Sequence, residues 1–163
     1  MNFQRRLTIS TLAVAAIALA GCASTPTPVS IADTAARTPS LSTLNTLINQ
    51  AGLAETLRGT GPFTVFAPSN EAFKAVPAKT MADLAANKEL LRAVLTHHVL
   101  AGQVKAAQVK PGTVKTVNGS DLALSSAGTF VTVEDAVVQQ ADVQASNGVV
   151  HVIDRVLMPP VKR

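Results

Sequence analysis

The chain has 163 residues, of which 47% are hydrophobic and 15% are charged, and it carries one cysteine, three histidines and no tryptophan or tyrosine. This composition is too apolar for a chain disordered throughout, and the length fits one domain plus a targeting segment. One cysteine excludes a disulfide framework and any zinc or iron–sulfur site that needs several cysteines. With aromatic residues at only 3%, stacking on single-stranded nucleic acid is not expected.

The N-terminal residues have the layout of an export signal. Two arginines precede an apolar stretch, residues 7–20, which is short for a membrane-spanning helix. It ends in Leu19-Ala20-Gly21-Cys22, which resembles the lipobox of bacterial lipoproteins at all four positions. The resemblance implies cleavage after Gly21 and attachment of diacylglycerol to the Cys22 thiol. The alternative is an ordinary signal peptide followed by a cysteine by chance.

We therefore predict a signal peptide over residues 1–21, a lipidated cysteine with a short tether over 22–29, and one domain over 30–160. Removal of the signal takes two arginines away and lowers the formal net charge of +4 by two. The remaining cations are scattered, so no nucleic-acid partner is expected. The acyl chains would hold the protein on a lipid bilayer almost permanently. Ala23 resembles the outer-membrane sorting residue of Gram-negative lipoproteins.

The domain begins with helical patterns. Ser30-Ile31-Ala32-Asp33 matches a capping box and predicts a helix that ends at Thr38-Pro39. Apolar residues then recur at helical spacing over 41–51, and Gly52 is typical of a helix C-terminus. Residues 53–58 predict one or two further turns.

A short apolar run, 63–67, predicts a buried strand inside this helical half. Ser69 can cap the helix that follows the strand. Thr80-Met81-Ala82-Asp83 matches a second capping box. Asn87 can cap a last helix with one apolar face formed by Leu90, Leu91, Val94 and Leu95.

The second half of the domain has strand patterns. Two Asn-Gly pairs, Asn118-Gly119 and Asn147-Gly148, predict hairpin turns. Helices first and strands after, without alternation, favour an α+β domain with mostly antiparallel pairing. The predicted strands are Val99–Val104, Thr113–Val117, Leu122–Leu124, Phe130–Val133, Ala136–Val143 and Val149–Leu157.

Two segments closely resemble the signature boxes of the fasciclin (FAS1) domain: Thr64 to Phe73, TVFAPSNEAF, and Asn147 to Pro160, NGVVHVIDRVLMPP. Between them, Leu95 to Leu100 is similar to the family's Tyr-His segment, with His97 in place of tyrosine. The resemblance spans Val29 to Met158. It implies a wedge-shaped β-sandwich with helices packed on it, a role in adhesion and protein interaction at cell surfaces, and no general catalytic activity.

The residues of the two boxes have structural roles that can be stated from their chemistry. Val150, Val152 and Val156 share one strand face while Val149, Ile153 and Leu157 share the other, so the strand is predicted to be buried on both sides. Asp154 interrupts this apolar run and should accept hydrogen bonds from neighbouring backbone or hydroxyl groups rather than bind a ligand. The residues assigned to the structural motif are Thr64, Pro68, Ser69, Asn70, Phe73, Asn147, Gly148, His151 and Asp154.

The histidines do not predict a metal site. His97 and His98, read as strand neighbours, would point to opposite faces, and no HxxxH or HExxH spacing occurs. By the family pattern His98 is the inward residue, and His97 should face outward near the surface that animal relatives use for receptor contact. The candidate partner-binding residues are His97, His98, Val99 and Leu100.

No catalytic residues are predicted. The sequence has no GxSxG elbow and no Walker lysine, and the lipid would occupy Cys22. We expect no cofactor and no enzymatic activity. The leading hypothesis is a membrane-anchored interaction or adhesion module of the bacterial cell envelope, periplasmic or surface-facing, with a protein, envelope or matrix component as partner. The alternatives are a carrier of a small apolar ligand held between helices and sheet, and a hydrolase that uses His98 with a nearby hydroxyl.

Overall fold

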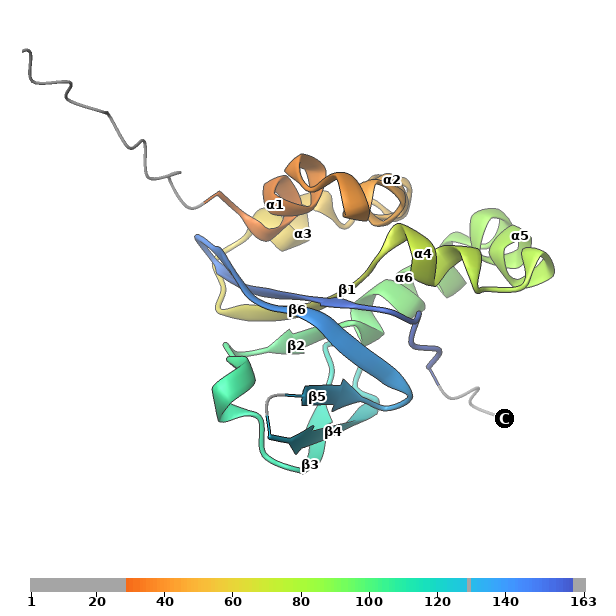
Figure 1. Ribbon diagram of the computed structural model, residues 1–163. Coiled ribbons are helices and arrows are strands. Elements are labelled where there is room, and N and C mark those ends of the chain that lie inside the picture. The colour runs from red at the N-terminus through yellow and green to blue at the C-terminus, as the bar shows by residue number, and fades with distance from the viewer. Residues whose placement is uncertain (1–28, 129, 160–163) are drawn as a thin grey trace, which may run out of the picture.

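The computed structural model describes residues 29–128 and 130–159 of the chain. The predictions for the signal peptide, Cys22 and most of the tether lie outside these residues. Figure 1 shows α1, α2 and α3 above the sheet, and α4, α5 and α6 at the end where the described chain finishes. The helices are α1 (Ile31–Arg37), α2 (Ser42–Ala51), α3 (Ala54–Arg58), α4 (Asn70–Lys74), α5 (Ala78–Ala86) and α6 (Lys88–His97), with short 3-10 turns at Pro39–Leu41 and Ala106–Gln108.

The strands form one seven-stranded sheet in the order β2-β1-β7-β6-β5-β4-β3. Only the β1–β7 pair is parallel, which agrees with the predicted mostly antiparallel pairing. A bridge between Leu100 and Thr116 brings the two edges of the sheet together, so the sheet nearly closes into a barrel-like sandwich. The strands are β1 (Phe63–Pro68), β2 (Val99–Ala101), β3 (Gly112–Lys115), β4 (Asp121–Ala127), β5 (Phe130–Val133), β6 (Ala136–Ala145) and β7 (Gly148–Ile153).

Strand β7 separates two hydrophobic cores. Val150 and Val152 face the core beneath the helices, whereas Ile153 belongs to the core inside the curved sheet. All six residues of β7 are buried, which confirms the prediction that this strand has no solvent face. The regular strand ends at Ile153, earlier than the predicted end at Leu157.

Local hydrogen bonds explain why the predicted helix boundaries agree with the structure. The Ser30 hydroxyl accepts from the Asp33 amide at 3.2 Å and donates to the Asp33 carboxylate at 2.7 Å. Gly52 ends α2 with φ 72°, a conformation that costs glycine little. The Ser69 hydroxyl accepts from the Ala72 amide at 3.3 Å, and Asn87 caps α6. These caps are confirmed.

Two local predictions are wrong, and a correctly predicted hairpin turn is shifted by one residue. Thr80-Met81-Ala82-Asp83 does not cap a helix, because α5 has already begun at Ala78, after Pro77. Leu90 is 39% exposed and lies off the buried face of α6. The second hairpin turn consists of Ser146 and Asn147, and Gly148 already pairs with Ala145 as part of β7.

Candidate functional site

The two signature boxes lie side by side as the parallel strands β1 and β7. Thr64 pairs with Val149 and Pro68 with Ile153, so the strand portions of the two boxes run in register. The Phe63 amide donates to the Asn147 carbonyl at 3.1 Å, and the Ser69 amide donates to the Ile153 carbonyl at 3.0 Å. The boxes therefore supply two adjacent inner strands of the sheet.

Asn147 joins three segments at one end of this strand pair. Its side-chain oxygen accepts from the Ile31 amide at 2.9 Å, at the start of α1. Its side-chain nitrogen donates to the carbonyls of Leu57 and Gly59 at 2.7 and 2.9 Å. Asn147 thus satisfies backbone groups at two helix termini as well as supplying the turn that the sequence indicated.

Gly148 permits the close approach of β7 to β1. A Cβ atom at this position would overlap the carbonyl oxygen of Phe63 and reach the side chain of Ile31. Gly148 has no positive φ, so the need for glycine comes from space and not from backbone conformation. This requirement follows from tertiary packing and was not evident from the turn pattern.

The polar residues of the boxes bind backbone groups. Thr64 donates to the Gly102 carbonyl at 2.7 Å and accepts from the Val104 amide at 2.8 Å. Asp154 accepts from the Val137 amide at 2.7 Å, which confirms the predicted hydrogen-bonding role.

Asn70 and Phe73 connect the first box to the helical layer. The Asn70 side chain accepts from the Thr43 amide and donates to the Pro39 carbonyl, both at 3.0 Å. Phe73 is buried in the core beneath the helices. Asn70 and Phe73 therefore hold the first box against the helices.

His98 is a buried residue of the core, as predicted. Its Nε2 accepts from the Leu157 amide at 3.0 Å, so Nδ1 carries the proton and donates to the Val94 carbonyl at 2.8 Å. Burial lowers the pKa of His98 to about 4, against which the bond to Val94 acts. Both ring nitrogens are occupied by backbone groups, so the structure offers no nitrogen of His98 as a base for a hydrolase.

The prediction that His97 faces outward is wrong. His97 is the last residue of α6 and is 0% exposed, because the helix continues through a position that had been read as strand. Neither ring nitrogen has a hydrogen-bond partner, although Nε2 lies 3.9 Å from the Glu134 carboxylate. Burial lowers the pKa of His97 and raises that of Glu134. The Glu134 side chain is 32% exposed.

The hydrogen bonds and the ring stacking of His151 involve neither His97 nor His98. Its Nε2 bonds to the Val104 carbonyl at 2.8 Å, Nδ1 accepts from the Asp142 amide at 3.2 Å, and its ring stacks on Phe66. Across residues 29–128 and 130–159, no three His, Cys, Asp or Glu side chains gather in a way that could hold a metal ion.

The candidate partner-binding segment is not on the surface. His97, His98 and Leu100 are at most 2% exposed, and Val99 is 6% exposed. A partner would need a local opening of the domain to touch them. Exposed apolar side chains lie elsewhere: Phe130, on β5, is 67% exposed.

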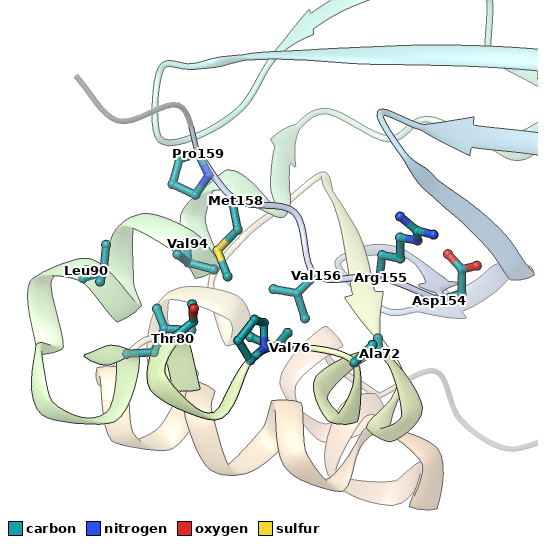
Figure 2. A pocket seen from close by; sticks show the side chains of 13 residues that line it. Ala72, Val76, Thr80, Leu90, Val94, Asp154, Arg155, Val156, Met158 and Pro159 are labelled. Carbon is teal, nitrogen blue, oxygen red and sulfur yellow. The ribbon is translucent and has the colours of Figure 1, made fainter. Parts of the chain in front are cut away.

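An apolar groove of about 720 Å³ lies where the chain leaves β7 and passes the helices α4, α5 and α6. Figure 2 shows Val76, Val94, Val156 and Met158 around it, with Arg155 and Asp154 towards one end. Sequence reasoning placed a possible cleft between helices and sheet but did not identify these residues. Their grouping depends on the path of the segment after Ile153, which has no periodic pattern.

The fold and its boxes define a fasciclin-type domain, and comparison with known proteins agrees. The fasciclin domain model matches residues 39–159, most of the chain, so this chain belongs to the fasciclin domain family. It is 45% identical over 141 residues to protein sll1483 of Synechocystis sp., covering 85% of this chain and 78% of that protein. It is 40% identical over 138 residues to immunogenic protein MPB70 of Mycobacterium bovis, and the match covers 82% of this chain and 69% of that protein.

Two further similarities concern surface proteins. Cell surface glycolipoprotein MPB83 of Mycobacterium bovis is 38% identical over 149 residues, which cover 88% of this chain and 65% of that protein. The solved structure of a FAS1 domain pair from the insect cell adhesion molecule Fasciclin I matches with a TM-score of 0.59 and 24% identity. The match covers 76% of this chain and 46% of that chain, and it supports the fold alone. Among the residues described here, no helix has the length and hydropathy needed to cross a bilayer.

Proposed function

We propose that this protein is a lipid-anchored, non-enzymatic interaction module of the bacterial cell envelope. Residues 1–21 direct export and are removed, Cys22 carries the lipid, and residues 22–29 tether the domain near the bilayer. The domain over residues 30–160 then presents its surface to a protein, envelope or matrix component, either in the periplasm or outside the cell.

The observation that carries the proposal is the combination of a fasciclin domain with the sequence Leu19-Ala20-Gly21-Cys22 a short distance before it in the chain. The 38% identity to a protein named a cell surface glycolipoprotein supports the same location. The polar box residues support a non-catalytic role, because hydrogen bonds to backbone groups occupy Thr64, Asn70 and Asn147.

The anchor is tested by the mass and labelling of the mature protein. Cells grown with a radiolabelled fatty acid should incorporate label into the wild-type protein, and its N-terminal peptide should begin at Cys22. The Cys22→Ser variant is the matched control and should carry no label. A labelled Cys22→Ser protein, or a mature chain that retains residues 1–21, would overturn the anchoring proposal.

The interaction role is tested by cross-linking in living cells followed by purification of the tethered protein. We expect a defined envelope or matrix neighbour, and reduced attachment or envelope integrity in a deletion strain. Phe130→Ser removes the most exposed of the large hydrophobic side chains in the described part of the chain and should weaken capture if that strand face takes part. A deletion strain with wild-type attachment and envelope integrity, and no reproducible neighbour, would contradict the proposal.

The groove favours a second candidate function, a carrier of a small apolar ligand. Its volume, about 720 Å³, falls within the range of roughly 300 to 1,000 Å³ typical of ligand sites. Native mass spectrometry of protein purified from its own host should then show a bound apolar molecule. Repeated recovery of the ligand-free mass alone would exclude the carrier function.

A further inference from the structure

The groove beside α5 and α6 is chemically different at its two ends. Leu90 and Met158 line it and are 39% and 40% exposed, so large apolar side chains face solvent there. In Figure 2, Leu90 lies at one end and Arg155 lies beyond Val156 towards the other. A ligand that fills this groove would meet hydrocarbon along most of its length and, at one end, the Arg155 guanidinium with the Asp154 carboxylate beside it.

Arg155 is available for an external anion. It is exposed, and it forms none of the ion pairs found in the described residues. The neighbouring acid, Asp154, has an oxygen engaged by the Val137 amide at 2.7 Å. Arg155 is also the only lysine or arginine that lines the groove within the described part of the chain. Asp154 also lines this end but forms no ion pair with Arg155 in the described residues, so the guanidinium next to a long apolar wall suits the head group of an amphipathic monoanion.

We propose that this groove binds a long-chain fatty acid, with its carboxylate at Arg155 and its hydrocarbon chain lying along Val76, Val156 and Met158 towards Leu90. The assignment rests on the carrier function above and names its ligand class. Arg155 supplies a charged hydrogen-bond donor for the carboxylate, and the apolar walls remove methylene groups from water. Met158 adds a flexible side chain that can adapt to chains of different shape.

The absence of native tryptophan makes a direct test possible. A Leu90→Trp variant of the full chain, reconstituted into phosphatidylcholine vesicles, places one fluorophore in the groove, and Met158→Trp provides a second reporter if the first does not fold. Dibrominated stearate is the probe, because bromine quenches tryptophan at contact. We expect saturable quenching of both groove reporters. Phe130→Trp, an exposed control on β5, should show no saturable quenching.

The charge contribution is tested in the same assay. Adding Arg155→Gln should weaken binding of dibrominated stearate by about threefold, the size expected for one exposed ion pair. Arg37→Gln, an exposed arginine on α1, should leave it unchanged. The dibrominated alcohol of the same chain length should bind more weakly and be insensitive to Arg155→Gln.

The results that would overturn the assignment are equally specific. Absence of saturable quenching, equal quenching of Phe130→Trp, or equal binding of acid and alcohol would each exclude a fatty-acid site. Vesicles of dibrominated phosphatidylcholine that quench Leu90→Trp as strongly would identify a phospholipid chain instead. A neutral apolar molecule found on protein from the host would leave the carrier function standing while removing the fatty acid.

Discussion

Acid should destabilise this domain before its carboxylates are protonated, because His98 is buried as a neutral ring. The pKa of His98 falls from 6.5 to about 4 on folding, so below pH 6.5 the unfolded chain binds a proton that the folded chain does not. Stability conferred by the neutral ring is complete above pH 6.5 and is lost as the pH falls towards 4. The loss is about 2 kcal/mol at pH 5 and approaches about 3 kcal/mol below pH 4.

The assay is urea unfolding followed by far-UV circular dichroism, since the native chain has no tryptophan or tyrosine to report fluorescence. Midpoints at pH 7.5, 6.5, 5.5 and about 4.5 would follow the loss in a range where most carboxylates stay ionised. His98→Gln keeps a donor and an acceptor but does not titrate in this range. Its stability should depend less on pH, although it is lower at pH 7.5. Equal pH dependence in wild type and His98→Gln would refute the reasoning.

Three substitutions test other contacts through the free energy of unfolding at pH 7.5. His97→Phe should stabilise the domain by about 1 kcal/mol, because it removes two buried nitrogens without partners; a loss of stability would contradict this expectation. Gly148→Ala should cost more than about 3 kcal/mol through overlap with the Phe63 carbonyl, whereas Gly119→Ala, with φ 79° in open space, should cost only about 1 kcal/mol. Comparable costs at the two glycines would contradict the packing argument. Asn147→Ala should cost about 3 kcal/mol by leaving three backbone groups unpaired, and a cost below about 1 kcal/mol would mean that water replaces the side chain.

The features that the sequence predicted well depend on neighbouring residues. Ser30, Ser69 and Asn87 cap helices through bonds to amides two or three positions away, so their patterns are sufficient. The alternating faces of β7 were readable because a strand sandwiched between two cores has apolar residues on both sides. The family resemblance added the overall topology, which local patterns alone do not determine.

The errors occurred where distant parts of the chain decide the outcome. His97 was read as a strand residue that faces outward by the family pattern, yet α6 continues through it and buries it. Gly148 was assigned to a turn, although its essential property is the space that it leaves for Phe63, far away in the sequence. The groove depends on Arg155, Val156 and Met158 crossing the helices, a path that no periodicity encodes.

The position of β7 in the sheet limits when the domain can fold. Strand β7 lies between β1 and β6, so the β2-β1 pair cannot join the other strands of the sheet through β6 until residues 148–153 have been made. A growing chain can form its early helices, but neither core is complete before β7 has been made, because Val150 and Val152 belong to one core and Ile153 to the other.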